Sequence, residues 1–321
     1  MENYLSAVNR ILVSETASIR RLVVYGENIN KGSCIVGVAR GLKVHESGRI
    51  INVGNCESTH CGLGFGLMMK GISSILFVKQ LDFMLLGMDH FVNTYNIIRC
   101  HREASSLGSF TIVTVVCDQG YQGPQSSFNA LGDICSLAQV PGYTLTNEQD
   151  ASLVLKTQLQ KPGFRFIALS QRLFPAEITR LGTVYQAEDA SLFQYSEGKD
   201  VTIVCFNFSL PEGVHLQKAL SADGLGASLF SVNAVPGASW KRILESARKT
   251  QNVVVLDDSK STSQSCFKLF HEISTEFPSC RCVAVTRDRF EFGVCPDNFE
   301  LDENYLVKNI RCFAKKIDRE Q

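Results

Sequence analysis

The 321-residue chain has no excess of either charge and no long uncharged apolar run. Lysine plus arginine total 32, and so do aspartate plus glutamate, so there is no electrostatic reason to expect a nucleic acid or an anionic membrane as partner. No uncharged apolar run approaches the roughly 20 residues of a membrane span. The first residues mix charges among apolar side chains and lack a signal-peptide core. We therefore expect a cytoplasmic protein that spans no membrane.

Twelve cysteines are present, yet none of them belongs to a C-x-x-C motif. The closest pairs are Cys56 with Cys61 and Cys280 with Cys282, and this spacing argues against a zinc ribbon. In a reducing compartment such thiols behave as small hydrophobic residues. We therefore expect reduced, mostly packed cysteines and no metal site made by this chain alone.

Strand-like apolar runs alternate with amphipathic stretches of helical period, in a chain long enough for two domains. The predicted strands are Leu22–Tyr25, Ile75–Val78, Thr111–Cys117, Phe166–Leu169, Val201–Phe206, Ala227–Val232, Asn252–Asp257 and Arg281–Val285. The predicted helices are Cys61–Lys70, Phe83–Cys100, Gln149–Leu159, His215–Ala222, Trp240–Arg248 and Ser263–Phe277. The alternation is typical of α/β domains, each with a mostly parallel sheet flanked by helices.

The stretch from 172 to 199 interrupts this alternation. It is mostly polar and contains Pro175, Gly182 and Gly198, which is typical of a connector between domains. We therefore predict one domain over residues 1–185 and a smaller one over residues 186–321.

The most informative segment is Arg49–Gly66, in which a short apolar run ends in polar residues and Glu57 then opens a glycine-rich helix. A carboxylate in the first turn complements the helix dipole. Gly62, Gly64 and Gly66 each cost up to about 1 kcal/mol relative to alanine, so close approach of another helix or a ligand is expected to offset them. The G-x-G-x-G spacing fits a dinucleotide-binding loop poorly. On these residues alone, a dipole-capping glutamate before a tightly packed helix and a ligand site both stay open.

Several motifs follow one another in order along nearly the whole chain. They are Gly26–Ile29 with Lys31–Gly32, Val53–Glu57, Leu81–Phe83, Met88–Asn93, Glu197–Val204 and Ser246–Thr250. In that order they resemble the motifs G-E-D-V-x-x-x-G, T-P-x-S-E, A-D-(Phe/Tyr), F-D-Q-I-V-N, E-G-x-D-V-T-I-V and S-V-x-K-T of one family. This family comprises the beta subunits of the decarboxylating component of 2-oxo acid dehydrogenases, among the transketolase-like thiamine diphosphate enzymes. The resemblance implies a pyrimidine-binding fold followed by a fold like the C-terminal domain of transketolase.

The resemblance also implies roles for three residues in binding thiamine diphosphate. Glu57 stands at the position of the family's glutamate, whose protonated carboxyl promotes the imino tautomer of the aminopyrimidine ring and requires an apolar, buried site. Phe83 stands where the family has the aromatic residue that stacks on that ring; without the resemblance, a core phenylalanine on an amphipathic helix would be the better interpretation. Glu27 matches a family acidic residue near the cofactor pocket, and a structural role is equally open.

The chain carries no G-D-G motif, which in this superfamily holds the diphosphate through Mg²⁺ together with a following asparagine. The nearest string, Leu131–Ile134, lacks the second glycine. A chain that has the catalytic glutamate but not the metal-binding loop would hold half of an active site, as the resemblance to a beta subunit implies. We therefore expect an alpha-type partner that holds the diphosphate and Mg²⁺, in an α2β2 assembly with the site between the subunits.

The family also has a histidine in the loop Y-H-S-Q-S-P-E, which serves acyl transfer to lipoyl-bearing partners. No histidine occurs between His101 and His215, and an ungapped alignment puts Asn129 at that position. An asparagine can hydrogen-bond but cannot donate or accept a proton near neutral pH, which argues against transfer to a lipoyl arm. We assign Gln122, Gln125 and Asn129 to a retained but altered acceptor loop.

His60 lies one helical turn after Glu57, where the family usually has an apolar residue. One hypothesis is that His60 reaches the cleft and takes over part of the missing acid–base chemistry. The alternative is that it contacts the partner subunit or a backbone carbonyl.

The sequence therefore predicts the beta-type half of a thiamine diphosphate enzyme that cleaves a 2-oxo acid or ketose. The acyl or ketol unit would then pass to a small acceptor, as in a carboligase or transketolase. The first alternative is a conventional dehydrogenase beta subunit that acts with a lipoyl acyltransferase. The second is a non-catalytic paralogue that serves as an interaction module. The presence of both Glu57 and Phe83 argues against the second alternative, because a scaffold has no need of a tautomer-setting carboxylate.

Overall fold

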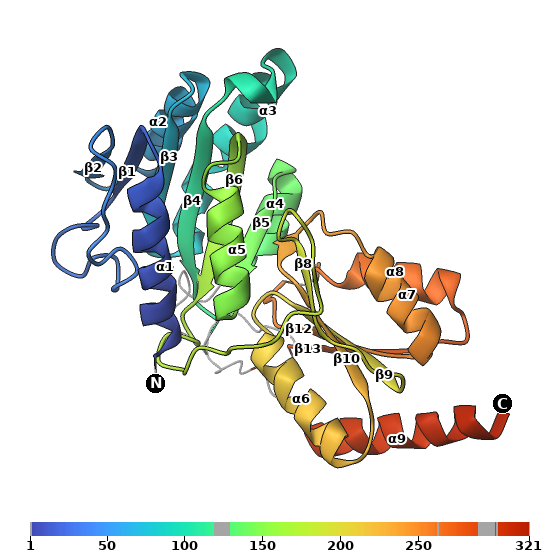
Figure 1. Cartoon of the computed structure of the whole chain (residues 1–321). Helices are drawn as coiled ribbons and strands as arrows, with labels where there is room; N and C mark the ends of the chain where they lie inside the picture. Colours follow the sequence, from blue (N-terminus) through green and yellow to red (C-terminus); the bar gives the residue numbers. More distant parts are fainter. Residues whose placement is uncertain (1, 119–128, 262, 288–298, 300, 321) are drawn as a thin grey trace, which may run out of the picture.

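The computed structural model describes residues 2–118, 129–261, 263–287, 299 and 301–320, which form two sheets flanked by helices (Figure 1). The α/β fold class predicted from the sequence is confirmed. A division of the chain at residue 185 stays a prediction, since one short strand of the later residues pairs with the first sheet.

The first sheet has seven strands in the order β11-β5-β6-β4-β3-β1-β2. All neighbouring pairs are parallel except β11 with β5. The strands are β1 (Leu22–Gly26), β2 (Arg49–Asn52), β3 (Ser73–Val78), β4 (Ser109–Val116), β5 (Gly142–Leu145), β6 (Gly163–Ser170) and β11 (Ala234–Val235). The central strand β4 reads SFTIVTVV and is buried along its whole length, as a parallel strand covered on both faces requires.

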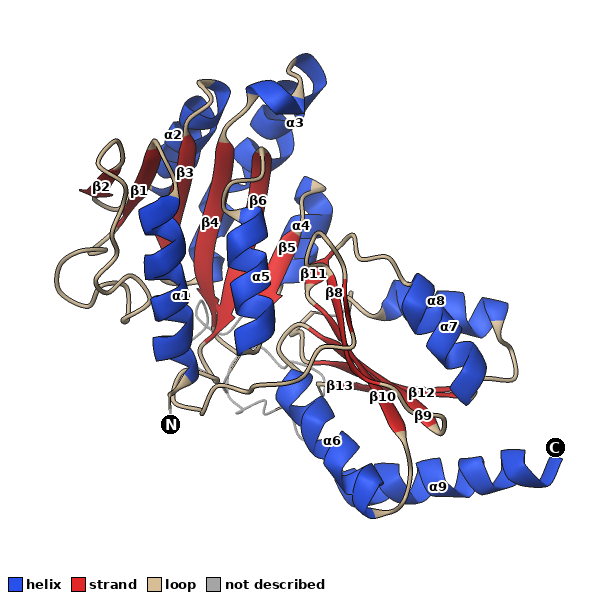
Figure 2. Cartoon of the chain, viewed as in Figure 1, coloured by secondary structure: helices blue, strands red, loops and turns tan. Residues whose placement is uncertain are grey.

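Helices cover both faces of this sheet (Figure 2). On one face lie α1 (Tyr4–Ser18) and α5 (Glu148–Gln158), and α5 begins with a capping box between Asn147 and Asp150. On the other face lie α2 (Glu57–Met69), α3 (Tyr95–His101) and α4 (Leu131–Ala138). The 3-10 helix η1 (Leu81–Gly87) and the π-helical turn η2 (His90–Thr94) pack against α2, and η3 (Ala104–Ser106) precedes β4.

The second sheet has six strands in the order β13-β12-β9-β10-β8-β7. Its parallel strands are β9 (Val201–Phe206), β10 (Ala227–Val232), β12 (Asn252–Asp257) and β13 (Arg281–Thr286), and β8 (Leu192–Ser196) and β7 (Tyr185–Gln186) add antiparallel pairs. In Figure 1, α6 (Leu210–Ala222) and α9 (Glu303–Glu320) lie on one face of this sheet, and α7 (Lys241–Thr250) and α8 (Phe267–Glu276) on the other.

A buried charge network joins the carboxyl ends of β4 and β12, one strand from each sheet. Asp118 and Asp258 are fully buried, and the Arg172 guanidinium lies 3.7 Å and 3.3 Å from their carboxylate oxygens. The Arg287 guanidinium donates to the backbone carbonyls of both aspartates, at 2.8 Å and 2.6 Å. Burial, and then the neighbouring Asp258, raise the pKa of Asp118. Charges removed from water must be paired in this way. The network therefore links the two sheets.

Each of the eight predicted strands has a counterpart in the structure, but the single helix predicted over Phe83–Cys100 is wrong. That stretch is a 3-10 helix, a π-helical turn and a short α-helix in succession. A Cβ at Gly87 would lie 2.7 Å from the Cys61 sulfur and 2.7 Å from the Phe91 ring. The 3-10 helix ends at Gly87, where this close approach occurs. A hydrophobic period in the sequence cannot reveal such a contact.

The glycines of α2 differ in their surroundings, although the sequence alone gives no reason to distinguish them. A Cβ at Gly64 would lie 2.3 Å from the ring of Phe110 on β4. That ring is fully buried and packs against Phe65 and Phe164 at centroid distances of 5.1 and 5.0 Å, so it has no room to yield. No atom of the described residues lies within 4 Å of a Cβ at Gly66. The expected close approach is thus found at Gly64, and its partner is a strand side chain.

We expect Gly64→Ala to destabilise the protein by about 1–3 kcal/mol, because the added methyl group overpacks the aromatic cluster. The matched control is Gly66→Ala, which should be neutral or stabilising by up to about 1 kcal/mol because alanine favours the helix. Urea denaturation of the two variants beside the parent protein measures the difference. Equal midpoints for the two variants would contradict the packing argument.

Candidate functional site

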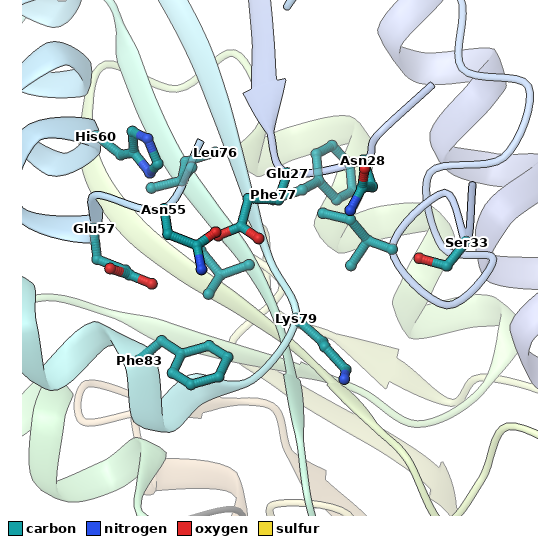
Figure 3. A pocket seen from close by; sticks show the side chains of 12 residues that line it. Glu27, Asn28, Ser33, Asn55, Glu57, His60, Leu76, Phe77, Lys79 and Phe83 are labelled. Atoms are coloured by element: carbon teal, nitrogen blue, oxygen red, sulfur yellow. The ribbon is translucent and has the colours of Figure 1, made fainter. Parts of the chain in front are cut away.

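One cavity lies at the carboxyl ends of β1 and β3, the edge at which ligands bind in open α/β sheets. It has a volume of about 240 Å³, and Figure 3 draws the side chains around it. The lining residues come from the segments after β1 and β2, the first turns of α2, the end of β3 and η1. They are Glu27, Asn28, Ser33, Ile35, Asn55, Glu57, His60, Leu76, Phe77, Val78, Lys79 and Phe83.

Glu57 and His60 reach this cavity from the first two turns of α2. Glu57 is half-buried and occupies the first turn, where a carboxylate complements the helix dipole. His60 is buried, and its ring meets the ring of Tyr25 edge-on at 6.4 Å. The Tyr25 hydroxyl donates to the His60 carbonyl at 2.8 Å, which ties this turn of α2 to the end of β1. The structure thus brings the two predicted catalytic residues to one cavity.

The cysteines beside Glu57 differ in burial. Cys61 is fully buried, and burial together with the charge of Glu57 raises the pKa of its thiol to about 12. It therefore packs as a neutral side chain. Cys56 is exposed, and its sulfur lies 2.9 Å from the Thr59 hydroxyl.

Glu27 is held at the cavity by Asn55. With the Asn55 amide nitrogen facing it, the carboxylate accepts two hydrogen bonds, at 2.5 and 2.6 Å. The preceding Gly26 has φ 156°, and a Cβ there would lie 2.5 Å from the Phe77 carbonyl oxygen. Only glycine fits where β1 passes so close to β3, which accounts for the glycine before this glutamate.

Phe83 lies half-buried on η1 and borders the cavity near Lys79 in Figure 3. The predicted set missed Asn28, Asn55 and Lys79, which also line the cavity. Asn28 and Lys79 come shortly after the ends of β1 and β3, so their place just beyond predicted strands was the available signal.

The predicted acceptor loop does not lie at this cavity as far as the structure describes it. Asn129 is fully buried, and its amide donates to the Asp258 carbonyl at 2.9 Å. The backbone carbonyl of Asn129 accepts from the Lys260 backbone N–H at 3.0 Å. Gln122 and Gln125 lie outside the described residues, and the acceptor role of all three stays a prediction.

Within the described ranges, no group of three or more His, Cys, Asp or Glu side chains could hold a metal ion. Among the same residues, none of the helices has the length and apolar character needed to cross a membrane.

We expect Asn55→Asp to destabilise the protein at neutral pH by about 1 kcal/mol or more, because it sets a second carboxylate against Glu27. Like charges at this distance raise the pKa of one partner. The destabilisation of Asn55→Asp relative to Asn55→Ser should therefore be smallest at acidic pH. It should grow as the pH rises through that raised pKa. Thermal melts of Asn55→Asp and of the uncharged Asn55→Ser between pH 4 and 8 make the test. A pH-independent difference between the two would contradict the pairing of Asn55 with Glu27.

No protein-family model matches the chain. The chain is 22% identical over 301 residues to the pyruvate dehydrogenase E1 component subunit beta-1, mitochondrial, of Oryza sativa subsp. japonica, covering 90% of this chain and 76% of that protein. It is 22% identical over 269 residues to the 2-oxoisovalerate dehydrogenase subunit beta of Bacillus subtilis (strain 168), covering 81% of each.

The fold is similar to a solved structure of a split-gene transketolase, an inactive beta4 tetramer. The TM-score is 0.68 at 18% sequence identity, and the match covers 97% of this chain and 96% of the other. Because 18% is a low identity, this likeness concerns the fold alone. The resemblance found in the sequence is confirmed: the chain is a homologue of the E1 beta subunits of 2-oxo acid dehydrogenases, with a transketolase-like fold.

Proposed function

We propose that the chain is the beta-type subunit of a heteromeric thiamine diphosphate-dependent enzyme. In this proposal the enzyme cleaves a 2-oxo acid or a ketose and transfers the acyl or ketol unit to a small acceptor. The observation that carries it is the convergence of Glu27, Glu57 and Phe83 on one cavity, from three separate segments. Homology to E1 beta subunits supports the same assignment.

The cavity suits one part of the coenzyme. Its volume of about 240 Å³ is below the roughly 300–1,000 Å³ typical of complete small-molecule sites. The half-buried Phe83 offers an aromatic face, Leu76 and Val78 offer apolar contacts, and Glu57 offers a carboxyl group. This set matches a substituted pyrimidine ring, which needs stacking on its face and one hydrogen bond at its edge.

When bound, thiamine diphosphate supplies the carbon nucleophile for attack on a carbonyl group. In our proposal this chain holds the proton at Glu57 that keeps the pyrimidine in its reactive tautomer. A partner that closes the cavity would remove the solvent left around Glu57, and burial favours the neutral form of a carboxyl group. Glu27, clamped by Asn55, would orient the other edge of the site.

The diphosphate and its Mg²⁺ are assigned to an alpha-type partner, most simply in an α2β2 assembly. The chain has no G-D-G motif, and the described part of it has no cluster of metal-binding side chains. Localisation in the cytoplasm stays a prediction from the sequence.

The alternative is a 2-oxo acid dehydrogenase beta subunit that works with a lipoyl acyltransferase. The names of the curated relatives favour it, whereas the asparagine at the position of the family's loop histidine disfavours it. Reductive acylation of an isolated lipoyl domain distinguishes the two, since a carboligase would leave the domain unmodified and release a carbon–carbon coupled product.

We expect Glu57→Gln to reduce turnover by about 10²–10⁴-fold, the usual contribution of one acid–base group, while assembly is unchanged. The chain is co-expressed with an alpha-type partner that carries the G-D-G motif, and products are screened with pyruvate and hydroxypyruvate. Glu303→Gln is the matched control, because Glu303 also lies in the first turn of a helix but not at the cavity. Turnover by Glu57→Gln equal to that of the control would overturn the proposed function.

His60→Ala tests whether His60 shares the acid–base chemistry. We expect kcat to fall by about 10²-fold and one limb of the pH–rate profile to disappear. The control is His90→Ala, because His90 contacts Ser58 and Thr94 and does not line the cavity. An unchanged profile for His60→Ala would remove His60 from the mechanism and leave it as a packing residue against Tyr25.

A further inference from the structure

A second cavity lies between η1 and α4, next to the one described above. It has a volume of about 190 Å³, and its walls are almost entirely apolar. We call it the Asp82 groove; it is lined by Leu81, Asp82, Leu85, Met88, Ala130, Asp133, Ile134 and Leu137.

Asp82 is the unusual member of this lining. Its side chain is 9% exposed, and its Oδ2 atom has no hydrogen-bond partner among the residues that the structure describes. A buried carboxyl oxygen without a partner is destabilising. A partner that binds in the adjoining apolar groove can place a cation beside this carboxyl group.

The charged and titratable groups around Asp82 come from three other elements. Asp133 lies on α4, Lys260 follows β12, and Cys117 follows β4. Burial raises the pKa of Asp82 to about 7, and the charge of Lys260 opposes that rise. The residues that line the groove include two carboxyl groups and no basic side chain, so its charge is complementary to a cation.

Exposed leucines border the groove on both sides. Leu85 and Leu86 of η1 are 55% and 64% exposed, and Leu137 of α4 is 64% exposed. Apolar side chains gathered in this way around an apolar cavity mark a protein interface.

The groove adjoins the cavity lined by Glu57 and Phe83, which in our proposal is the cofactor cavity, across η1. Phe83 lines the cofactor cavity, while Asp82 and Leu85, its neighbours on the same short helix, line the groove. A chain that approaches the cofactor cavity to complete it therefore also approaches the groove.

We propose that the Asp82 groove is a docking site for the alpha-type partner, which inserts an apolar side chain and places a neighbouring lysine or arginine against Asp82. The existence of that partner rests on the proposed function. The cation pairs with the carboxylate of Asp82, and the apolar side chain covers Leu85 and Leu137.

The test is association of the full chain with a co-purified alpha-type partner that carries the G-D-G motif, measured by sedimentation. Leu137→Glu adds a third negative charge to the groove and should weaken association by about 10-fold or more. Ile97→Glu is the matched control, because Ile97 is 63% exposed on α3 and does not line the groove. Equal association constants for the two variants would overturn the proposal.

A second variant tests the cation. A partner cation lowers the pKa of Asp82 in the complex, so association should tighten as the pH rises from 6 to 8. Asp82→Asn should remove this dependence, and its melting temperature reports whether the fold is retained. If the parent protein and Asp82→Asn keep the same pH dependence, the cationic contact is wrong.

The remaining outcomes separate the two proposals. If the wild-type chain binds no alpha-type partner, both the proposed function and the docking proposal are wrong. If the complex forms equally well with Leu137→Glu, only the docking proposal is wrong. If Leu137→Glu dissociates self-assembled copies of the chain and leaves the mixed complex intact, the groove binds a second copy instead. At saturating partner concentration Leu137→Glu should recover turnover, whereas Glu57→Gln should not.

Discussion

The candidate site depends on the parallel pairing of β2, β1 and β3. Parallel strands end at the same edge of a sheet, so the segments that follow them converge there whatever their separation in sequence. The tightest point is Gly26, where the backbone of β1 passes so close to the Phe77 carbonyl that no side chain fits. Glu27 comes directly after this contact and is thereby delivered to the edge where Glu57 also lies.

The position of Glu57 is set by how α2 sits on the sheet. The close contact between Gly64 and the Phe110 ring lets the helix lie against β4, and the hydrogen bond from Tyr25 to the His60 carbonyl ties its second turn to β1. Both contacts are made by buried groups with little freedom to move. A carboxyl group that must meet one edge of a ring benefits from such rigid support.

Two cavities lie on either side of η1. The cavity at Glu57 is smaller than a usual ligand site. The Asp82 groove has exposed leucines beside a carboxyl oxygen that finds no hydrogen-bond partner among the described residues. In a protein that acted alone, the exposed leucines and the unpartnered oxygen would cost free energy without benefit. Both proposals place a second polypeptide over η1, which would complete the first cavity and cover the second.

Much of this could be predicted from the sequence alone. The Val- and Ile-rich runs determined the eight predicted strands and hence the α/β class, and the order of short motifs pointed to Glu27, Glu57 and Phe83, which meet at one cavity. These inferences succeeded because hydrophobic period and local motif are properties of neighbouring residues. The clamp of Asn55 on Glu27, the contact that singles out Gly64 among the α2 glycines, the broken winding near Gly87 and the burial of Asn129 against Asp258 depended on tertiary structure. Each is a contact between segments that only the packing of the sheets brings together, and no local pattern records such a distance.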